Sequence, residues 1–334
     1  MKAVRYWGKD EIRYEDVPKP LIGQDEVLIK VAYTGICGSD TSIYSGTHPR
    51  AKAPLVLGHE LSGTIAELPT NDRSGLKAGD VVTVNPLLYC GECQPCVTGN
   101  YHVCRSLGLT GIDQDGSFAE YVKVKARQVV KLPAGMSAEQ GALIEPVAVA
   151  VHSLHRSAFK MGDIALVIGG GPIGFLVAAA LKAAGAGKIF VVEPNEYRRS
   201  IIAGLGVETL TPDESGRVLE FTGGNGADIV FEVAGVPASI EAAIKYCKIR
   251  GQIVNVGVFK QPAPVNLQRL NFAELDLIGT RVYTDQAFRS AVSLTSQCPQ
   301  LVQVITHRLP LDQAQQGLAL MKQGGDNLKI LLQP

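Results

Sequence analysis

The chain has 334 residues, a length that predicts about two domains. Apolar residues make up 46 % of it and charged residues 19 %, so a large core can be buried and a disordered chain is excluded. The 32 basic residues equal the 32 acidic ones, which gives a formal net charge of zero. This balance argues against a nucleic-acid-binding protein, an acidic tail or a polybasic membrane-binding patch.

The start of the chain gives no sign of export, because residues 1–16 contain no apolar run of the kind found in signal peptides. One uncharged stretch, residues 164–181, reaches the lower length limit for a membrane span. Three consecutive glycines from residue 169 and Pro172 interrupt it, so a strand, a turn and a helix are the better interpretation. We therefore expect a cytoplasmic protein with no membrane partner and no nucleic-acid partner.

Residues 1–150 predict a β-rich domain. Short segments rich in β-branched residues are separated by Gly, Pro and Asp, which is typical of strands joined by turns. These segments are VLIKVAY (27–33), LSGTIAEL (61–68), DVVTVNP (80–86) and AEYVKV (119–124). The pattern suits a compact barrel with long excursions.

From about residue 151 the pattern changes to strands that alternate with helices, which predicts βαβ units and a doubly wound parallel sheet. The predicted strands are residues 165–171, 188–194, 227–235 and 252–258; helices are predicted at 172–186 and 239–249, and the second of these includes Cys247. Near the end of the chain, a helix is predicted at 311–325 and a last strand at 328–334.

Four of the seven cysteines form a C-x2-C-x2-C-x7-C cluster, namely Cys90, Cys93, Cys96 and Cys104. A cytosolic protein rarely keeps disulfides, and short spacers let several thiolates converge on one tetrahedral ion. Four thiolates leave no coordination position for a reactant, so the cluster predicts a structural Zn²⁺ site. A disulfide pair and an iron–sulfur site are the alternatives. Cys247 and Cys298 are expected to be structural, as free cysteines usually are.

A glycine-rich G-x-G-x-x-G motif follows the apolar run at 165–168 and opens a predicted helix. In that context it is a dinucleotide-binding fingerprint, whose helix N-terminus faces the pyrophosphate. The first glycine allows the tight turn, the second lets the backbone approach the pyrophosphate and the third packs helix on strand. The cofactor-binding residues are Gly169, Gly171, Pro172, Ile173 and Gly174. A glycine-rich loop of another α/β fold is the alternative.

Glu193 ends the second predicted strand, 19 residues after Gly174. A carboxylate there accepts hydrogen bonds from the adenosine ribose and repels a 2′-phosphate, which favours NAD over NADP. Arg198 and Arg199 leave the alternative open, because either guanidinium can pair with a 2′-phosphate. We include Arg198 among the predicted cofactor-binding residues.

Other residue types that bind metals occur in three short segments. Cys37 lies in GICGSD (35–40), His59 and Glu60 lie in LGHE (57–60), and Glu145 lies in LIEP (143–146). None of these is a metal-binding motif by spacing alone.

These segments, the cysteine cluster, GSFAEY (116–121) and VIGGGPIG occur in one order over essentially the whole chain, and together they resemble the zinc-dependent medium-chain dehydrogenase family. The chain is most similar to the polyol branch of sorbitol, butanediol and sugar-alcohol dehydrogenases, of which LIEPVAVAVH is the mark. The resemblance implies an α/β protein with a GroES-like catalytic domain (1–150), a Rossmann NAD-binding domain (151–285) and a C-terminal return to the catalytic domain (286–334).

The resemblance also implies two zinc ions per subunit and hydride transfer from a zinc-bound alkoxide to NAD. Cys37, His59 and Glu145 match the catalytic zinc ligands, and Glu60 matches a residue that binds the metal directly or through water. A second carboxylate ligand would make the zinc ion a weaker Lewis acid. We therefore expect Glu60 to bind the zinc only transiently, or to contact the residues that bind it rather than the ion itself. Ser39 matches the hydroxyl that takes the alcohol proton.

The outer proton relay departs from the family, because Ser42 stands where relatives commonly carry histidine. His48, which follows shortly after, is expected to be a surface histidine.

Four residues match positions that line the polyol-branch substrate pocket: Tyr44, Phe118, Arg281 and Tyr283. The loop after Tyr44 is basic and contains His48, Arg50 and Lys52; we interpret it as a solvent-exposed loop rather than as an anion-binding site.

Two alternative functions remain. The nearest is activity on the substrates of the family's threonine and sugar-acid dehydrogenases, and a further one is a non-catalytic NAD-binding relative. We expect a homodimer or homotetramer, because residues 252–258 followed by 275–283 are apolar enough to extend a sheet across a two-fold axis.

Overall fold

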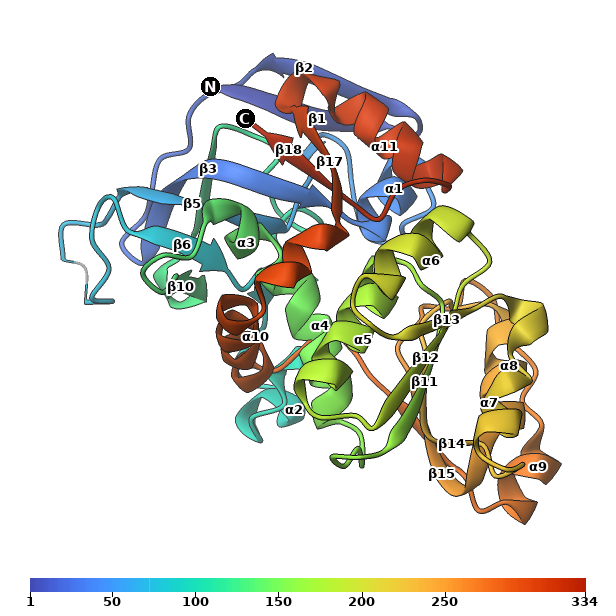
Figure 1. The fold of residues 1–334 in the computed structure, drawn as a ribbon. Helices are drawn as coiled ribbons and strands as arrows, with labels where there is room; N and C mark the ends of the chain where they lie inside the picture. Colours follow the sequence, from blue (N-terminus) through green and yellow to red (C-terminus); the bar gives the residue numbers. More distant parts are fainter. Residues whose placement is uncertain (72) are drawn as a thin grey trace. The chain divides into compact units, whose positions relative to one another are not determined.

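The computed structural model describes residues 1–71 and 73–334 and divides the chain into two compact units (Figure 1). The first unit is Met1–Glu145 with Thr295–Pro334, and the second is Pro146–Leu294. The domain boundaries expected from the sequence, after residues 150 and 285, lie five and nine residues from these. Each boundary falls inside a helix, α4 (Ile144–His155) or α10 (Asp285–Gln297), where no turn or linker marks it in the sequence.

The first unit is β-rich, and its largest sheet is built around β3 (Glu26–Ile36). The strand order is β10-β6-β5-β3-β18-β17, and β9 also pairs with β3. The other strands of this sheet are β5 (Glu60–Glu67), β6 (Val81–Val84), β9 (Tyr121–Lys125), β10 (Val129–Lys131), β17 (Ile305–Pro310) and β18 (Lys329–Gln333). All four N-terminal segments expected to be strands are strands here, and the last one of the chain, β18, inserts beside β3.

Smaller elements complete this unit. A three-stranded sheet has the order β2-β1-β4, and β7 pairs with β8. Their bounds are β1 (Lys2–Gly8), β2 (Glu11–Asp16), β4 (Leu55–Val56), β7 (Leu87–Leu88) and β8 (Gly108–Leu109); the helices are α1 (Gly38–Tyr44), α2 (Gln94–Val97), α3 (Ala138–Ala142) and α11 (Ala314–Gln323).

The core of the first unit follows from alternation along its strands. Val27, Ile29 and Val31 point to the same face of β3 and are buried against Leu61 and Ile65 of β5. Because the side chains of a strand alternate, a slip of one residue would expose this set. The apolar pattern therefore fixes the register of β3 against β5.

The second unit is a six-stranded sheet in which every neighbouring pair is parallel, in the order β13-β12-β11-β14-β15-β16. This is the doubly wound order predicted from the alternation of strands and helices. The strands are β11 (Ile164–Ile168), β12 (Lys188–Val192), β13 (Glu208–Leu210), β14 (Ala227–Glu232), β15 (Cys247–Asn255) and β16 (Asp276–Gly279).

Helices cover the sheet, with α5 packed on β11 and β12 and α8 packed on β14 and β15 (Figure 1). The helices are α5 (Pro172–Ala183), α6 (Glu196–Ala203), α7 (Arg217–Phe221), α8 (Pro237–Tyr246) and α9 (Leu267–Phe272).

The helix predicted at 239–249 is wrong at its C-terminal end. Helix α8 stops at Tyr246, and Cys247 is extended, with a ψ of 134°, and opens β15. The reason is tertiary, because Cys247 pairs with Ala227 of β14 and its side chain is buried in the core of the sheet. Lys248 next to it forms an ion pair with Asp228. Such long-range pairing overrides helix propensity.

The uncharged stretch at 164–181 consists of β11, a turn and most of α5, as predicted. Among the described residues, no helix is both long and apolar enough to cross a membrane.

Candidate functional site

The four clustered cysteines converge at one point. Their Sγ atoms lie 3.5 Å (Cys93–Cys96), 3.5 Å (Cys90–Cys104), 3.8 Å (Cys93–Cys104) and 3.9 Å (Cys90–Cys96) apart. A disulfide would require about 2 Å, whereas four sulfurs around zinc at about 2.3 Å stand about 3.8 Å apart. All four are free cysteines. The spacing therefore fits a tetrahedral Zn²⁺ site and not a disulfide pair.

The thiols of this cluster differ in pKa. Hydrogen bonds from the Cys90 backbone and from Ser106 outweigh burial and lower the pKa of Cys104 to about 6. Burial, together with the neighbouring thiols, raises the pKa of Cys96 to about 12. Four adjacent thiols cannot all ionise without a positive charge among them, and a bound metal supplies that charge.

A second cluster lies where β3 ends and β5 begins. Cys37 follows the last residue of β3 and caps α1, while Glu60 opens β5 directly after His59. The ligand atoms of Cys37, His59 and Glu60 all lie within 4.8 Å of one another. His59 and Glu60 are buried. A thiolate, an imidazole and a carboxylate this close form a donor set that fits Zn²⁺.

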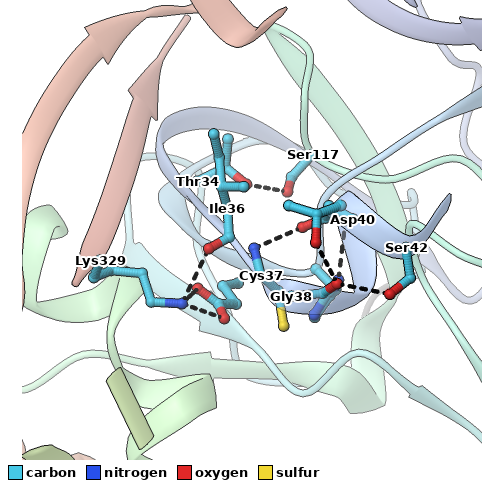
Figure 2. Close-up of polar contacts among 11 residues, drawn as sticks. Thr34, Ile36, Cys37, Gly38, Asp40, Ser42, Ser117 and Lys329 are labelled. Atoms are coloured by element: carbon cyan, nitrogen blue, oxygen red, sulfur yellow. Dashed lines mark hydrogen bonds and ion pairs between the residues drawn. The ribbon is translucent and has the colours of Figure 1, made fainter. Parts of the chain in front are cut away.

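Asp40 supports both Cys37 and His59. Its Oδ2 accepts a hydrogen bond from the Cys37 backbone N–H at 2.8 Å (Figure 2). Its Oδ1 lies 3.9 Å from His59 Nδ1. Burial lowers the pKa of His59, but the charge of Asp40 and the thiol of Cys37 outweigh it and raise that pKa well above its usual value. A carboxylate facing Nδ1 of a histidine leaves Nε2 for a metal.

Glu60 forms a buried ion pair with Lys329. Both Glu60 carboxylate oxygens lie 2.7 Å from Lys329 Nζ, which also donates to the Ile36 carbonyl at 3.2 Å (Figure 2). The side chains are 1 % and 3 % exposed. Burial lowers the pKa of Lys329, but Glu60 and Cys37 outweigh it and raise that pKa. Gly35 makes room for the pair, because a Cβ there would stand 2.0 Å from Glu60 Oε2.

Glu145 lies in the first turn of α4 and is 5 % exposed. Its charge raises the pKa values of both His59 and Lys329, so it is near them, but it stands outside the group formed by Cys37, His59 and Glu60. The family resemblance implies Glu145 as a ligand ahead of Glu60, whereas the structure groups Glu60 with Cys37 and His59.

Ser39 lies two residues after Cys37, in α1. Its Oγ is buried and makes no hydrogen bond to the described residues. A buried hydroxyl normally finds a partner, so this one is available to a bound molecule. Ser42, by contrast, donates to the Gly38 carbonyl at 3.1 Å, and His48 Nδ1 accepts from the backbone of Arg50 at 3.4 Å.

The four residues predicted for the substrate pocket divide between the units. Tyr44 ends α1 and is 8 % exposed, and Phe118 is fully buried in the first unit. Tyr283 is fully buried in the second unit, with its ring centroid 5.5 Å from that of Phe288. Arg281 is exposed.

In the second unit the glycine-rich turn has the geometry that the fingerprint predicts. Gly169 has a φ of 107°, a conformation that favours glycine, and a Cβ at Gly174 would stand 1.8 Å from the Gly169 carbonyl oxygen. Gly171 caps α5 without any side-chain cap, and space is open around it. Pro172 and Ile173 form the first turn of α5, so unpaired backbone N–H groups face this opening.

A cavity of about 680 Å³ opens beside this turn. Gly169, Gly171, Glu193 and Arg198 line it, together with Ser215 and Lys245. Glu193 stabilises the turn, because its two oxygens accept from the backbone N–H groups of Gly170 at 2.8 Å and Asn195 at 2.9 Å. Arg199 instead donates to the carbonyls of Glu193 and Pro194.

Comparison with known proteins identifies the family. The model of the alcohol dehydrogenase GroES-like domain matches residues 23–134, and that of the zinc-binding dehydrogenase domain matches residues 172–297. The chain is 43 % identical to the 2-dehydro-3-deoxy-L-galactonate 5-dehydrogenase of Pseudoalteromonas atlantica over 273 residues, 80 % of each chain. This chain is a zinc-type medium-chain alcohol dehydrogenase. It is therefore an oxidoreductase.

Two further relatives show how varied this family is. The dehydrogenase is 38 % identical to the L-threonine 3-dehydrogenase of Bacillus velezensis, over 95 % of this chain and 94 % of that one. It superposes on the crystal structure of 2R,3R-butanediol dehydrogenase from Bacillus subtilis with a TM-score of 0.92, at 33 % identity, covering 100 % of this chain and 99 % of that one.

Two residues of this site were missed in the sequence analysis. Asp40 lies in the GICGSD segment and occupies the third position of α1, where an acidic residue commonly caps a helix. That position indicates a structural role, but nothing in the sequence indicates that Asp40 lies near His59. Lys329 is a charged residue at the head of an apolar strand, which is unusual, but its partner lies 269 residues away in the chain.

The four-thiolate cluster predicts a structural metal in this dehydrogenase. Cys90→Ser removes one ligand, so we expect one zinc fewer per chain and a melting temperature lower by several degrees, because a structural zinc site contributes to folding stability. Elemental analysis and thermal unfolding measure both. A variant with full zinc content and unchanged melting would contradict the assignment.

The glycine-rich turn offers a matched pair of variants. Gly174→Ala places a methyl group against backbone and is expected to lower the melting temperature. Gly171→Ala, at a φ of −67° and in open space, is expected to fold normally and to bind dinucleotide on the order of tenfold more weakly. Thermal unfolding and dinucleotide titration separate the two effects, and undiminished binding by Gly171→Ala would remove Gly171 from the site.

Proposed function

We propose that this protein uses zinc and NAD to interconvert a secondary alcohol of a polyol or sugar alcohol and the corresponding ketone. The observation that carries the proposal is the cluster of Cys37, His59 and Glu60 beside the unpartnered hydroxyl of Ser39. The dinucleotide turn in the second unit supports it.

We assign the catalytic zinc to Cys37 and His59 with the carboxylates of Glu145 and Glu60, and the structural zinc to Cys90, Cys93, Cys96 and Cys104. A zinc ion with an open position lowers the pKa of an alcohol bound to it. Ser39 is placed to accept the alcohol proton on its Oγ, because a hydroxyl can accept one proton and donate another. Asp40 faces Nδ1 of His59 and so orients the imidazole, which binds a metal in its neutral form.

The proton must then leave Ser39 by a route other than Ser42, whose hydroxyl is engaged by the Gly38 carbonyl. We assign this step to water; His48 Nδ1 already accepts from the backbone of its own loop.

For the cofactor, the backbone at Gly169, Gly171 and Gly174, with Pro172 and Ile173, is assigned to the pyrophosphate, and Glu193 to the adenosine ribose. Glu193 already accepts two backbone hydrogen bonds, which hold its carboxylate at the edge of the cavity. A fixed negative charge at that position disfavours the 2′-phosphate of NADP. Arg198 lines the same cavity and is assigned to the adenosine half of the cofactor.

For the substrate, we assign hydrogen bonding of hydroxyl groups to Tyr44 and shaping of the pocket wall to Phe118, both in the first unit. Tyr283 has no exposed surface, so we assign it no hydrogen bond to a substrate. A sugar acid is the second candidate substrate class, and the 43 % identity with a sugar-acid dehydrogenase favours it. Within the basic loop, Arg50 forms an ion pair with Asp113 at 3.3 Å and donates to the Leu107 carbonyl, so it is not available to recognise a carboxylate.

The function is tested with a screen of NAD⁺ and NADP⁺ reduction against C3–C6 polyols, butanediols, threonine and aldonates, on protein whose zinc content is known. We expect two zincs per chain and turnover of a polyol with NAD⁺. His59→Ala is expected to lose the catalytic zinc and at least about 10³-fold in turnover while still binding NAD. Turnover of aldonates or threonine alone would show that the substrate is not a polyol. No turnover of any substrate would favour a non-catalytic NAD-binding relative.

The choice of cofactor is tested with Glu193→Gln, which removes the charge but keeps the size of the side chain. We expect the ratio of NAD to NADP affinity to fall on the order of tenfold, because the repulsion of a 2′-phosphate is lost. Damage to the turn would weaken both dinucleotides alike, so the ratio isolates the charge. An unchanged ratio would show that Glu193 does not select the cofactor.

We also propose a homodimer or homotetramer in the cytoplasm. The strand β16 is the edge of the parallel sheet and exposes Leu277 to 40 %, and an exposed edge can pair with a second copy. The free state of all seven cysteines suits a reducing compartment. Sedimentation velocity measures the oligomeric state.

A further inference from the structure

The buried ion pair between Glu60 and Lys329 changes the charge of the candidate catalytic centre. A divalent ion with the Cys37 thiolate and the Glu145 carboxylate is neutral, and Glu60 as a further ligand would make the centre anionic. That charge was the reason to expect Glu60 to stay off the metal. The structure supplies the missing positive charge, because Lys329 Nζ lies 2.7 Å from both Glu60 oxygens.

The pair is built into three neighbouring strands. Glu60 on β5 stands opposite Gly35 of β3, and Lys329 on β18 lies on the other side of β3. Gly35 is the position where any side chain would collide with the Glu60 carboxylate. The Ile36 carbonyl accepts a further bond from Lys329, one residue before Cys37. The ammonium is thus held beside the backbone that presents the thiolate.

We propose that Lys329 is a positioning residue of the metal centre, which holds Glu60 near the metal but short of full coordination and cancels the charge that this carboxylate adds there. The inference rests on the proposed catalytic zinc site. It explains how Glu60 can lie within 4.8 Å of Cys37 and His59 without making the ion a weaker Lewis acid. It also accounts for a lysine that is 3 % exposed, since a buried charge is retained only where it is paired.

The test is Lys329→Met, which removes the charge and keeps most of the side-chain volume. With Glu60 left as a buried anion, we expect the metal-free protein to melt at a lower temperature and to bind Zn²⁺ and Co²⁺ on the order of tenfold more tightly. Chelator competition measures the affinity. The visible absorption of the Co²⁺-loaded protein is expected to change, because Glu60 moves fully onto the metal, and turnover is expected to fall.

Three further variants make the result decisive. Lys329→Arg keeps the charge and is expected to retain the metal affinity of the original protein. The double variant Lys329→Met with Glu60→Gln removes both charges and is expected to return the metal affinity and the Co²⁺ spectrum to near their original values. If the single variant Lys329→Met fails to fold, this double variant provides the test instead. Lys131→Met is the matched control, because it breaks an ion pair with Asp80 at the surface of the same unit. It is expected to change neither the metal affinity nor the Co²⁺ spectrum.

A lysine with a purely structural role would give a different result. Lys329→Met would then destabilise the metal-free and metal-loaded forms equally and would leave affinity and spectrum unchanged or weaken binding, which would overturn the proposal. Failure of the proposed function would be distinguishable from failure of this proposal. In that case the unmodified protein would bind no metal ion at Cys37 and His59, in addition to the one in the cysteine cluster.

Discussion

The position of strand β3 is the constraint on which the candidate metal centre depends. Its last residues pair with β5 on one side, where Gly35 stands opposite Glu60, and with β18 on the other, where Ile36 stands opposite Ile330. The chain then leaves the strand at Cys37 and enters α1. The pairing of these last residues therefore brings together thiolate, carboxylate and ammonium. The register of β3 against β5 shifts between Val31 and Tyr33, beyond the apolar set at 27–31, so the pairing of Gly35 with Glu60 belongs to the end of the strand.

Burial of so many charges at one place needs compensation within the site. Glu60 is paired with Lys329, and Asp40 faces His59, with each of the four side chains buried. An unpaired buried charge costs several kcal/mol, so the removal of one member is far more damaging than the removal of a pair. We therefore expect the residues that support the metal ligands to tolerate substitution no better than the ligands themselves.

Much of the fold was predictable, because local patterns determine it. The alternating apolar residues at 27–33 and the apolar run at 165–168 both became strands, and the glycine-rich turn has the geometry that its spacing implies. The metal ligands were reached only through resemblance, since no single segment identifies them. Contacts between distant residues could not be predicted. The partner of Lys329 depends on the insertion of the last strand beside β3, and Cys247 leaves its helix because of a pairing with β14.

The two candidate metal sites show how the donor set separates structure from chemistry. In the cysteine cluster, four like donors stand 3.5–3.9 Å apart and occupy every corner of a tetrahedron, so a bound ion has no position for a reactant. In the other cluster the donors differ in type and charge, and Ser39 and Asp40 lie in the adjoining helix. When Glu60 and Glu145 are both counted with Cys37, the positive charge of Lys329 offsets the second carboxylate. A centre balanced in this way can keep a carboxylate near the ion and still leave the ion electrophilic, which a closed set of thiolates cannot do.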